Sequence, residues 1–179
     1  MLKLCGNCLE IYDDFEPIVY CPKRSCRTDG ALVEIDDLLI DVVRKFWSID
    51  ISTAYCCSGH LYEENFSPYI IFYAHQFDEE NLKEASEWNL TELKEVYKFF
   101  HRFQKEGIMV GEIVRIKRGY GFTVRADIDQ VEYQQSPQER LKVQSNFLNF
   151  LYKTAKEIER LRVWEEKSWE KRDQSILQI

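Results

Sequence analysis

The sequence predicts an α+β fold, in which two helix–strand–strand units are followed by a long C-terminal helix and preceded by a small cysteine-rich module. Four of the six cysteines lie within the first 26 residues. Apolar residues at helical spacing precede β-branched and aromatic runs twice between residues 35 and 126, and helical spacing returns after residue 136. With 179 residues, 45% of them hydrophobic, the chain suits one medium-sized domain with a small satellite module. We expect boundaries at 1–30, 31–135 and 136–179.

The first helix–strand–strand unit is predicted over residues 35–73. Apolar residues recur at helical spacing through 35–47 and predict a helix with one wide apolar face. Asp36 and Asp37, in its expected first turn, would complement the helix dipole. Residues 49–57 are then predicted to form a strand, which Ser58-Gly59-His60 terminates, and residues 69–73 a second strand.

The second unit is predicted over residues 90–126. Asn89 followed three residues later by Glu92 is typical of a helix N-terminus, and the helix is expected to end near Gly107. Two strands, 108–116 and 120–126, flank a short glycine-containing connection that suits a hairpin. Two unrelated units of a common α+β layer are favoured over an internal duplication, because the two halves share little residue-level similarity.

A long C-terminal helix is predicted from residue 136 onward, packing on the core or on a partner. Ser136 is the expected cap, with Pro137 at the first helical position and Glu139 at the third. Trp164 and Trp169 lie among charged residues beyond the clear apolar spacing. Exposed tryptophans predict packing on a partner protein or on a second copy of the chain, which would make a homo-oligomer.

The cysteine pattern is the strongest chemical signal in the sequence. Cys5 and Cys8 are separated by two residues, and Cys21 and Cys26 by four. Two tight turns that each present a cysteine pair supply the four soft donors of tetrahedral Zn²⁺, so the pattern predicts a zinc ribbon over 1–30. Such a closed shell makes the zinc structural. The alternatives are four unligated thiols, or a redox-active pair formed by Cys5 and Cys8.

The cysteines and the lack of long apolar runs also bear on location. The N-terminus has no apolar core of a signal peptide, and no apolar run approaches the roughly 20 residues that span a bilayer. We therefore expect a cytoplasmic protein without membrane contact, in which paired cysteines are thiolate ligands and not disulfides.

A second candidate site follows the predicted strand 49–57. Cys57, Ser58 and His60 lie at the strand's end, where short polar loops often bind ligands. Cys57 would act as a nucleophile or ligand and His60 as an acid/base, although the sequence shows no carboxylate partner for them. Strand alternation places Cys56 and Cys57 on opposite faces, with one of them in the core. The competing interpretation is a buried cysteine, a glycine turn and a surface histidine.

The same segment carries two family resemblances over residues 35–72. The run from Ile35-Asp36-Asp37 through Cys57-Ser58-Gly59-His60 to Tyr69-Ile70-Ile71-Phe72 resembles small uncharacterised proteins of phages and Gram-positive bacteria, often with a cysteine-rich start. The strand ending in Cys-Ser-Gly is more distantly similar to the wybutosine-synthesising tRNA methyltransferase family, which uses S-adenosylmethionine. His60 stands where that family's motif continues with Arg.

Charge is unevenly distributed along the chain. The formal net charge is -7, which excludes a broadly cationic nucleic-acid binder. Residues 98–126 nevertheless hold seven basic and two acidic side chains, against eight and nineteen in residues 1–97. The basic residues predict a patch that contacts phosphate or an acidic partner. The candidate ligand-binding residues are Arg102, Arg115, Lys117, Arg118 and Arg125. A solvated face that protects a hairpin edge explains the same residues.

These features favour a zinc-containing binding or regulatory protein that recognises a macromolecule, such as RNA, DNA or a protein partner, or a phosphorylated ligand. The first alternative is an enzyme that modifies RNA or a nucleotide at Cys57, Ser58 and His60. The second, suggested by the phage resemblance, is a phage-encoded inhibitor of a host or defence protein, acting in the host cytoplasm.

Overall fold

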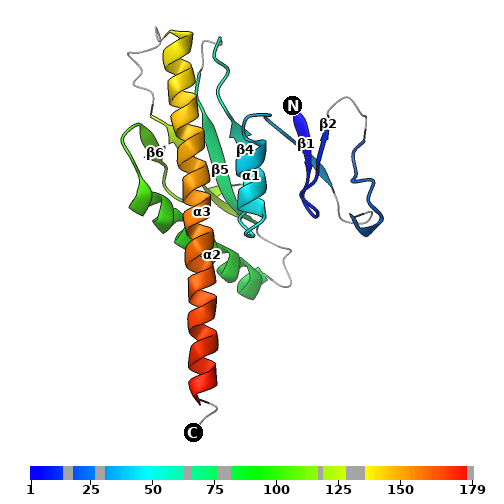
Figure 1. The fold of residues 1–179 in the computed structure, drawn as a ribbon, viewed down its shortest axis with the longest axis vertical. Helices are drawn as coiled ribbons and strands as arrows, with labels where there is room; N and C mark the ends of the chain where they lie inside the picture. Colours follow the sequence, from blue (N-terminus) through cyan, green and yellow to red (C-terminus); the bar gives the residue numbers. More distant parts are fainter. Residues whose placement is uncertain are drawn as a thin grey trace.

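The fold is α+β, as the sequence predicts. The protein is described by a computed structural model, which covers residues 1–13, 18–26, 31–62, 66–75, 82–116, 119–127 and 136–176, with only the backbone described at 24, 75, 82–89 and 163–176. The described residues form a three-stranded and a five-stranded antiparallel sheet and three α-helices (Figure 1). Among them, no helix combines the length and the apolar character required to cross a bilayer.

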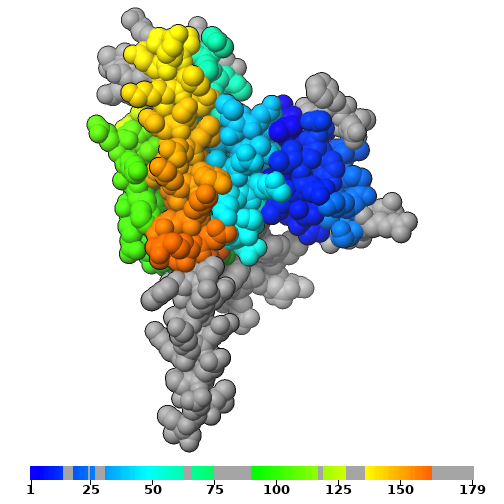
Figure 2. All heavy atoms as spheres, viewed as in Figure 1, coloured from blue at the N-terminus to red at the C-terminus, as the bar shows by residue number. Residues whose placement is uncertain are grey.

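The small sheet is built from the N-terminal residues and has the strand order β2-β1-β3. Its strands are β1 (Leu2–Cys5), β2 (Ile11–Asp13) and β3 (Leu32–Ile35). A short 3-10 helix, η1 (Arg24–Cys26), precedes β3. Because β3 pairs with β1 along its whole length, the small sheet extends to Ile35. Figure 2 shows this lobe beside the residues of α1 (Ile40–Trp47).

The large sheet has the strand order β4-β5-β8-β6, and β7 also pairs with β8. Its strands are β4 (Thr53–Cys57), β5 (Tyr69–His75), β6 (Ile108–Val110), β7 (Val114–Ile116) and β8 (Gly119–Ala126). The predicted strand 108–116 is therefore two strands. Val110 pairs with Val124 and Val114 pairs with Gly121. The three residues between Val110 and Val114 therefore lie opposite only two residues of β8, and the extra residue makes the break a β-bulge.

The predicted helix start at Ile35 is wrong, because Ile35 is the last residue of β3 and α1 begins at Ile40. The Leu39 amide donates to the Asp36 carbonyl at 2.9 Å, which closes a turn between the strand and the helix. Leu38 is 53% exposed and so lies outside the apolar face assigned to it. The buried strand residue Ile35 and the apolar residues of the turn after it have the spacing of a helix without forming one.

The second helix, α2 (Leu82–Phe103), begins before the predicted cap. Asn89 and Glu92 therefore lie within the helix, and the cap predicted there is wrong. The preceding Leu82-Lys83-Glu84-Ala85 consists of strong helix formers, so intrinsic propensity favours the helix upstream of Asn89.

The third helix, α3 (Pro137–Ile176), begins where the sequence predicts. The Ser136 amide donates to the Glu139 carboxylate at 2.7 Å, and the Glu139 amide donates to Ser136 Oγ at 3.4 Å. This reciprocal pair is a capping box. The helix crosses the large sheet and continues beyond it (Figure 1). The side chains of Trp164 and Trp169 lie outside the described residues, so the partner or second copy expected there stays a prediction.

The core lies between the large sheet and the three helices, which cover one face of that sheet (Figure 1). Four phenylalanines at its centre are almost completely buried, one each from α1, β5, α2 and β8: Phe46, Phe72, Phe100 and Phe122. The ring centroid of Phe72 lies 4.8 Å from that of Phe46, 4.7 Å from that of Phe100 and 5.2 Å from that of Phe122. Its ring therefore joins the sheet to both α1 and α2.

Truncation of this central ring should be strongly destabilising. We expect Phe72→Ala to lower the free energy of unfolding by about 3–5 kcal/mol, because it removes buried apolar surface and leaves a cavity. Urea unfolding followed by circular dichroism measures the change. The control Tyr62→Ala alters a side chain that is 87% exposed and should shift stability by no more than about 0.5 kcal/mol. Equal losses in both variants would contradict the central position of Phe72.

Candidate metal centre

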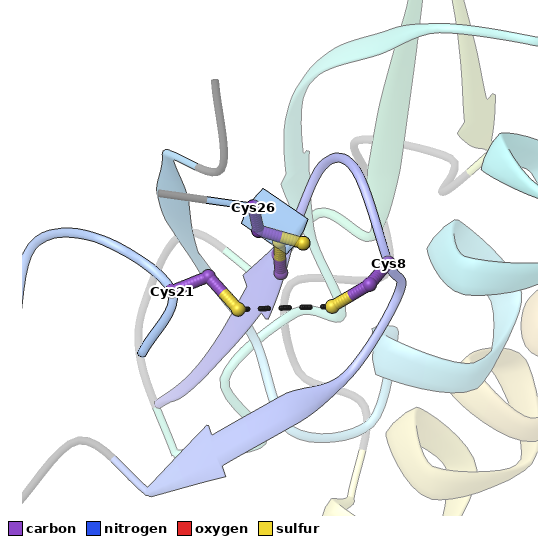
Figure 3. Close-up of side chains that lie close together, drawn as sticks. Cys8, Cys21 and Cys26 are labelled. Carbon is purple, nitrogen blue, oxygen red and sulfur yellow. Dashed lines mark hydrogen bonds between the residues drawn. The ribbon is translucent and has the colours of Figure 1, made fainter. Parts of the chain in front are cut away.

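The four N-terminal cysteines converge in the structure. Their Sγ atoms all lie within 4.8 Å of one another, and the Sγ atoms of Cys8 and Cys21 are 3.7 Å apart. Figure 3 shows the sulfurs of Cys8, Cys21 and Cys26 pointing toward one another. Four thiolates around a tetrahedral Zn²⁺, each with a Zn–S distance of about 2.3 Å, would be about 3.8 Å apart. The cluster could therefore hold a metal ion of this size.

Two turns bring the sulfurs together. Cys5 ends β1, and the Leu9 amide donates to the Cys5 carbonyl at 3.0 Å, which curls the chain so that Cys8 faces Cys5. Leu9 has a φ of 57°, the left-handed conformation that such a tight turn requires. The second pair is separated by four residues, and η1 takes up the extra length. Within it, the Cys26 amide donates to the Lys23 carbonyl at 3.0 Å.

The sulfurs occupy the place of a hydrophobic core in this module. Cys5, Cys21 and Cys26 are at most 2% exposed and form a cluster separate from the main core. Among the described residues, the hydrophobic side chains packed around it are those of Cys8, Tyr12 and Leu32. Leu4 and Ile35, by contrast, point into the main core. The small sheet thus contacts the large domain on one side and has mainly sulfur at its own centre.

The surroundings of the cluster shift the pKa values of two of its thiols in opposite directions. Burial by itself would raise the pKa of Cys21. Hydrogen bonds from the Tyr12 hydroxyl, 3.1 Å from Sγ, from the Lys23 amide and from the neighbouring thiols outweigh this effect and lower the pKa to about 7. Burial raises the pKa of Cys8 to about 12. Cys21 is therefore the thiol that ionises more readily, and thiolates are the form that binds metals. The Lys23 ammonium pairs with the Glu10 carboxylate at the edge of the module.

The structure also places the three residues of the second candidate site. Ser58 is 3% exposed, Cys57 is half-buried and His60 is exposed. Cys56 packs against the main core, whereas Cys57 lies close to Asp36 and His60. Burial, and then the charge of Asp36, raise the pKa of Cys56 to about 11.

Asp36 is a member of this second group that sequence reasoning missed. Its Oδ2 accepts hydrogen bonds from Ser58 Oγ at 2.8 Å and from the Ser58 amide at 3.1 Å. Asp36, Cys57 and His60 form a second set of metal-ligating side chains whose ligand atoms lie within 4.8 Å of one another. Asp36 supplies the carboxylate that the sequence did not reveal. Sequence spacing does not reveal this contact, because α1 and β4 lie between Asp36 and the loop that carries His60.

The predicted basic residues lie on different surfaces. In the β7–β8 pair Arg115 faces Tyr120, and in the β6–β8 pair Met109 faces Arg125. Tyr120 and Arg125 are five residues apart on one strand, so their side chains point to opposite faces of the sheet. Arg115 lies on the same face as its partner Tyr120, and therefore on the face opposite to Arg125. Arg102 is exposed at the end of α2. Lys117 and Arg118 lie outside the described residues.

Comparison of the chain with protein-family models, with curated proteins and with solved structures finds no match. The two family resemblances noted in the sequence therefore gain no support. Of the two side-chain clusters, the four-cysteine cluster has the more complete set of metal ligands.

Gln144 of α3 holds the loop that carries the second cluster, and its loss should be measurable. Gln144 is 3% exposed, and its Nε2 donates to the carbonyls of Ser58 at 3.0 Å and Gly59 at 2.8 Å. Gln144→Leu leaves two carbonyls without this donor, so we expect a loss of about 1–3 kcal/mol in the free energy of unfolding. The same change at exposed Gln138 of α3 is the control for urea unfolding. Similar stabilities of the two variants would contradict this role.

Proposed function

We propose that the chain is a zinc-binding protein and that Cys5, Cys8, Cys21 and Cys26 bind one Zn²⁺ in a structural module of the zinc-ribbon type. The observation that carries the proposal is the convergence of four sulfurs at a spacing close to that of a tetrahedral thiolate shell, with 3.7 Å between Cys8 Sγ and Cys21 Sγ. The cysteines come from two turns that flank a small sheet, as in a ribbon.

Zinc is favoured over other metals by the donor set. Four thiolates in tetrahedral geometry suit Zn²⁺ or a single iron ion, whereas Mg²⁺ and Ca²⁺ require oxygen ligands. Zn²⁺ has no redox chemistry and tolerates a closed shell whose role is to hold a fold. Few apolar side chains surround the cluster in the described part of the module, so a metal bound at its centre would supply further stabilisation.

Zinc content tests the proposal directly. We expect the purified, untagged chain to retain tightly bound zinc after desalting, and Cys21→Ser to lose one equivalent, as measured by plasma mass spectrometry. Cys56→Ala, which removes a thiol outside the four-cysteine cluster, is the matched control and should retain it. Iron in place of zinc would show as a coloured protein. A wild-type chain without metal, or Cys21→Ser with unchanged zinc, would refute the proposal.

For the role of the whole chain we infer binding of a macromolecule or phosphorylated ligand, as the sequence predicts. Two features support it. A shell of four thiolates leaves zinc no position for a substrate, so the metal would not itself catalyse a reaction. Arg102, Arg115 and Arg125 are exposed, and within the described part of the chain none of them takes part in an ion pair. Because Arg115 and Arg125 lie on opposite faces of the sheet, they would contribute to separate contacts.

Salt dependence tests the nucleic-acid form of this inference. We expect single-stranded RNA to bind with an affinity that falls as salt rises, because each phosphate contact releases counterions. Fluorescence anisotropy across a salt series measures the slope, and Arg125→Gln should weaken binding and reduce that slope. Lys153→Gln, which alters an exposed cation on α3, is the control. An absence of salt-sensitive binding to RNA, DNA and nucleotides alike would exclude the nucleic-acid form.

A further inference from the structure

The loop that follows β4 carries a second set of metal-binding groups. One oxygen of Asp36, the Sγ of Cys57 and one ring nitrogen of His60 lie within 4.8 Å of one another. They come from two distant segments, since Asp36 precedes α1 and the other two follow or end β4. We propose that Asp36, Cys57 and His60 bind a divalent transition-metal ion of the Zn²⁺ class, with its fourth coordination position open to solvent.

The donor set selects the class of metal. A thiolate and an imidazole are poor ligands for Mg²⁺ and Ca²⁺, which take oxygen donors almost exclusively. One sulfur, one nitrogen and one oxygen together match the ligands that Zn²⁺ accepts at distances of about 2.0–2.3 Å. The three ligand atoms are close enough to reach one such ion with small side-chain adjustments. The site therefore differs in kind from the all-sulfur cluster of the N-terminal module.

Asp36 is oriented for this role by its neighbours. Its Oδ2 accepts two hydrogen bonds from Ser58, and its Oδ1 accepts one from the Leu38 amide at 3.2 Å. A carboxylate has about four lone-pair sites, so these three bonds leave about one, on Oδ1, available for a metal ion. Hydrogen bonds that orient a metal-ligating carboxylate in this way are a regular feature of metal sites. Cys57 Sγ is likewise contacted by the Gly59 amide at 3.4 Å.

The loop that carries His60 is held on both sides. Gln144 of α3 donates to the Ser58 and Gly59 carbonyls before it, and Arg140 Nη1 donates to the Leu61 carbonyl after it at 2.9 Å. Gly59 has a φ of +80°, and a Cβ there would lie 2.7 Å from the Phe66 ring. Glycine is thus required for a turn whose shape α3 maintains. His60 projects from a rigid support although its side chain is exposed.

The geometry favours a shared ion over a proton-transfer triad. In a nucleophilic triad the histidine lies between the other two groups and forms hydrogen bonds with both. Here Asp36 bonds to Ser58, and among the described residues His60 has no hydrogen bond with Asp36 or Cys57. Instead the three ligand atoms are mutually close, as atoms around one centre are. His60 is exposed, so the remaining coordination position faces water and can exchange ligands.

Cobalt titration of the zinc-loaded chain tests the site, which is independent of the zinc module proposed above. With zinc in the four-cysteine cluster, one further equivalent of Co²⁺ should bind and give the visible bands of four-coordinate cobalt, with a thiolate charge-transfer band from Cys57. Addition of azide should shift these bands, because it enters the open position. Asp36→Asn and His60→Gln should each weaken cobalt binding at least about tenfold, since each removes a ligand.

Neighbouring residues supply the controls. Asp37→Asn and Cys56→Ala change the residues adjacent to two of the ligands and should leave the cobalt affinity unaltered. All variants should retain the tightly bound zinc of the N-terminal module, so failure of this site is distinguishable from failure of that one. His60 is exposed, so His60→Gln should fold normally, which circular dichroism checks. The absence of cobalt binding, equal loss in Asp37→Asn, or bands that azide does not shift would overturn the proposal.

Discussion

The hydrogen bonds between Asp36 and Ser58 link the two parts of the molecule. Asp36 directly follows β3, the last strand of the small sheet, and Ser58 directly follows β4 of the large sheet. Gln144 of α3 then contacts the Ser58 and Gly59 carbonyls from the other side. A bond that involves a charged acceptor contributes about 1.5–3 kcal/mol. One short loop therefore joins the N-terminal module, the sheet and the C-terminal helix, and it also carries the second group of candidate ligands.

The two parts of the chain are stabilised by different means. The large domain has a core of aromatic rings, with Phe72 in contact with rings from two helices and the neighbouring strand. The N-terminal module has sulfur atoms at its centre, and in its described part few apolar side chains surround them. Burial of apolar surface can stabilise the first without a ligand, whereas an ion bound by the four cysteines would add stability to the second.

Predictions from the sequence succeeded where the signal was local. The capping box at Ser136 and Glu139 involves residues three apart, and the structure confirms it. The helix start predicted at Ile35 was wrong because periodicity in a short apolar run does not distinguish a strand and turn from a helix. The cap predicted at Asn89 was wrong because strong helix formers upstream extend α2 to Leu82. The bulge after Val110 depends on pairing with β8 and has no local signature.

The sequence by itself indicated the four-cysteine cluster and most of the helices and strands of the fold. The two cysteine pairs have two and four residues between their members, so each pair needs only a tight turn to bring its sulfurs together, and such turns depend on nearby residues. Only the tertiary structure decided that Asp36 meets Cys57 and His60, and that Arg115 and Arg125 point to opposite faces of the sheet. These relations depend on strand register and on the packing of α3 against the β4 loop, which are long-range contacts that residue spacing does not record.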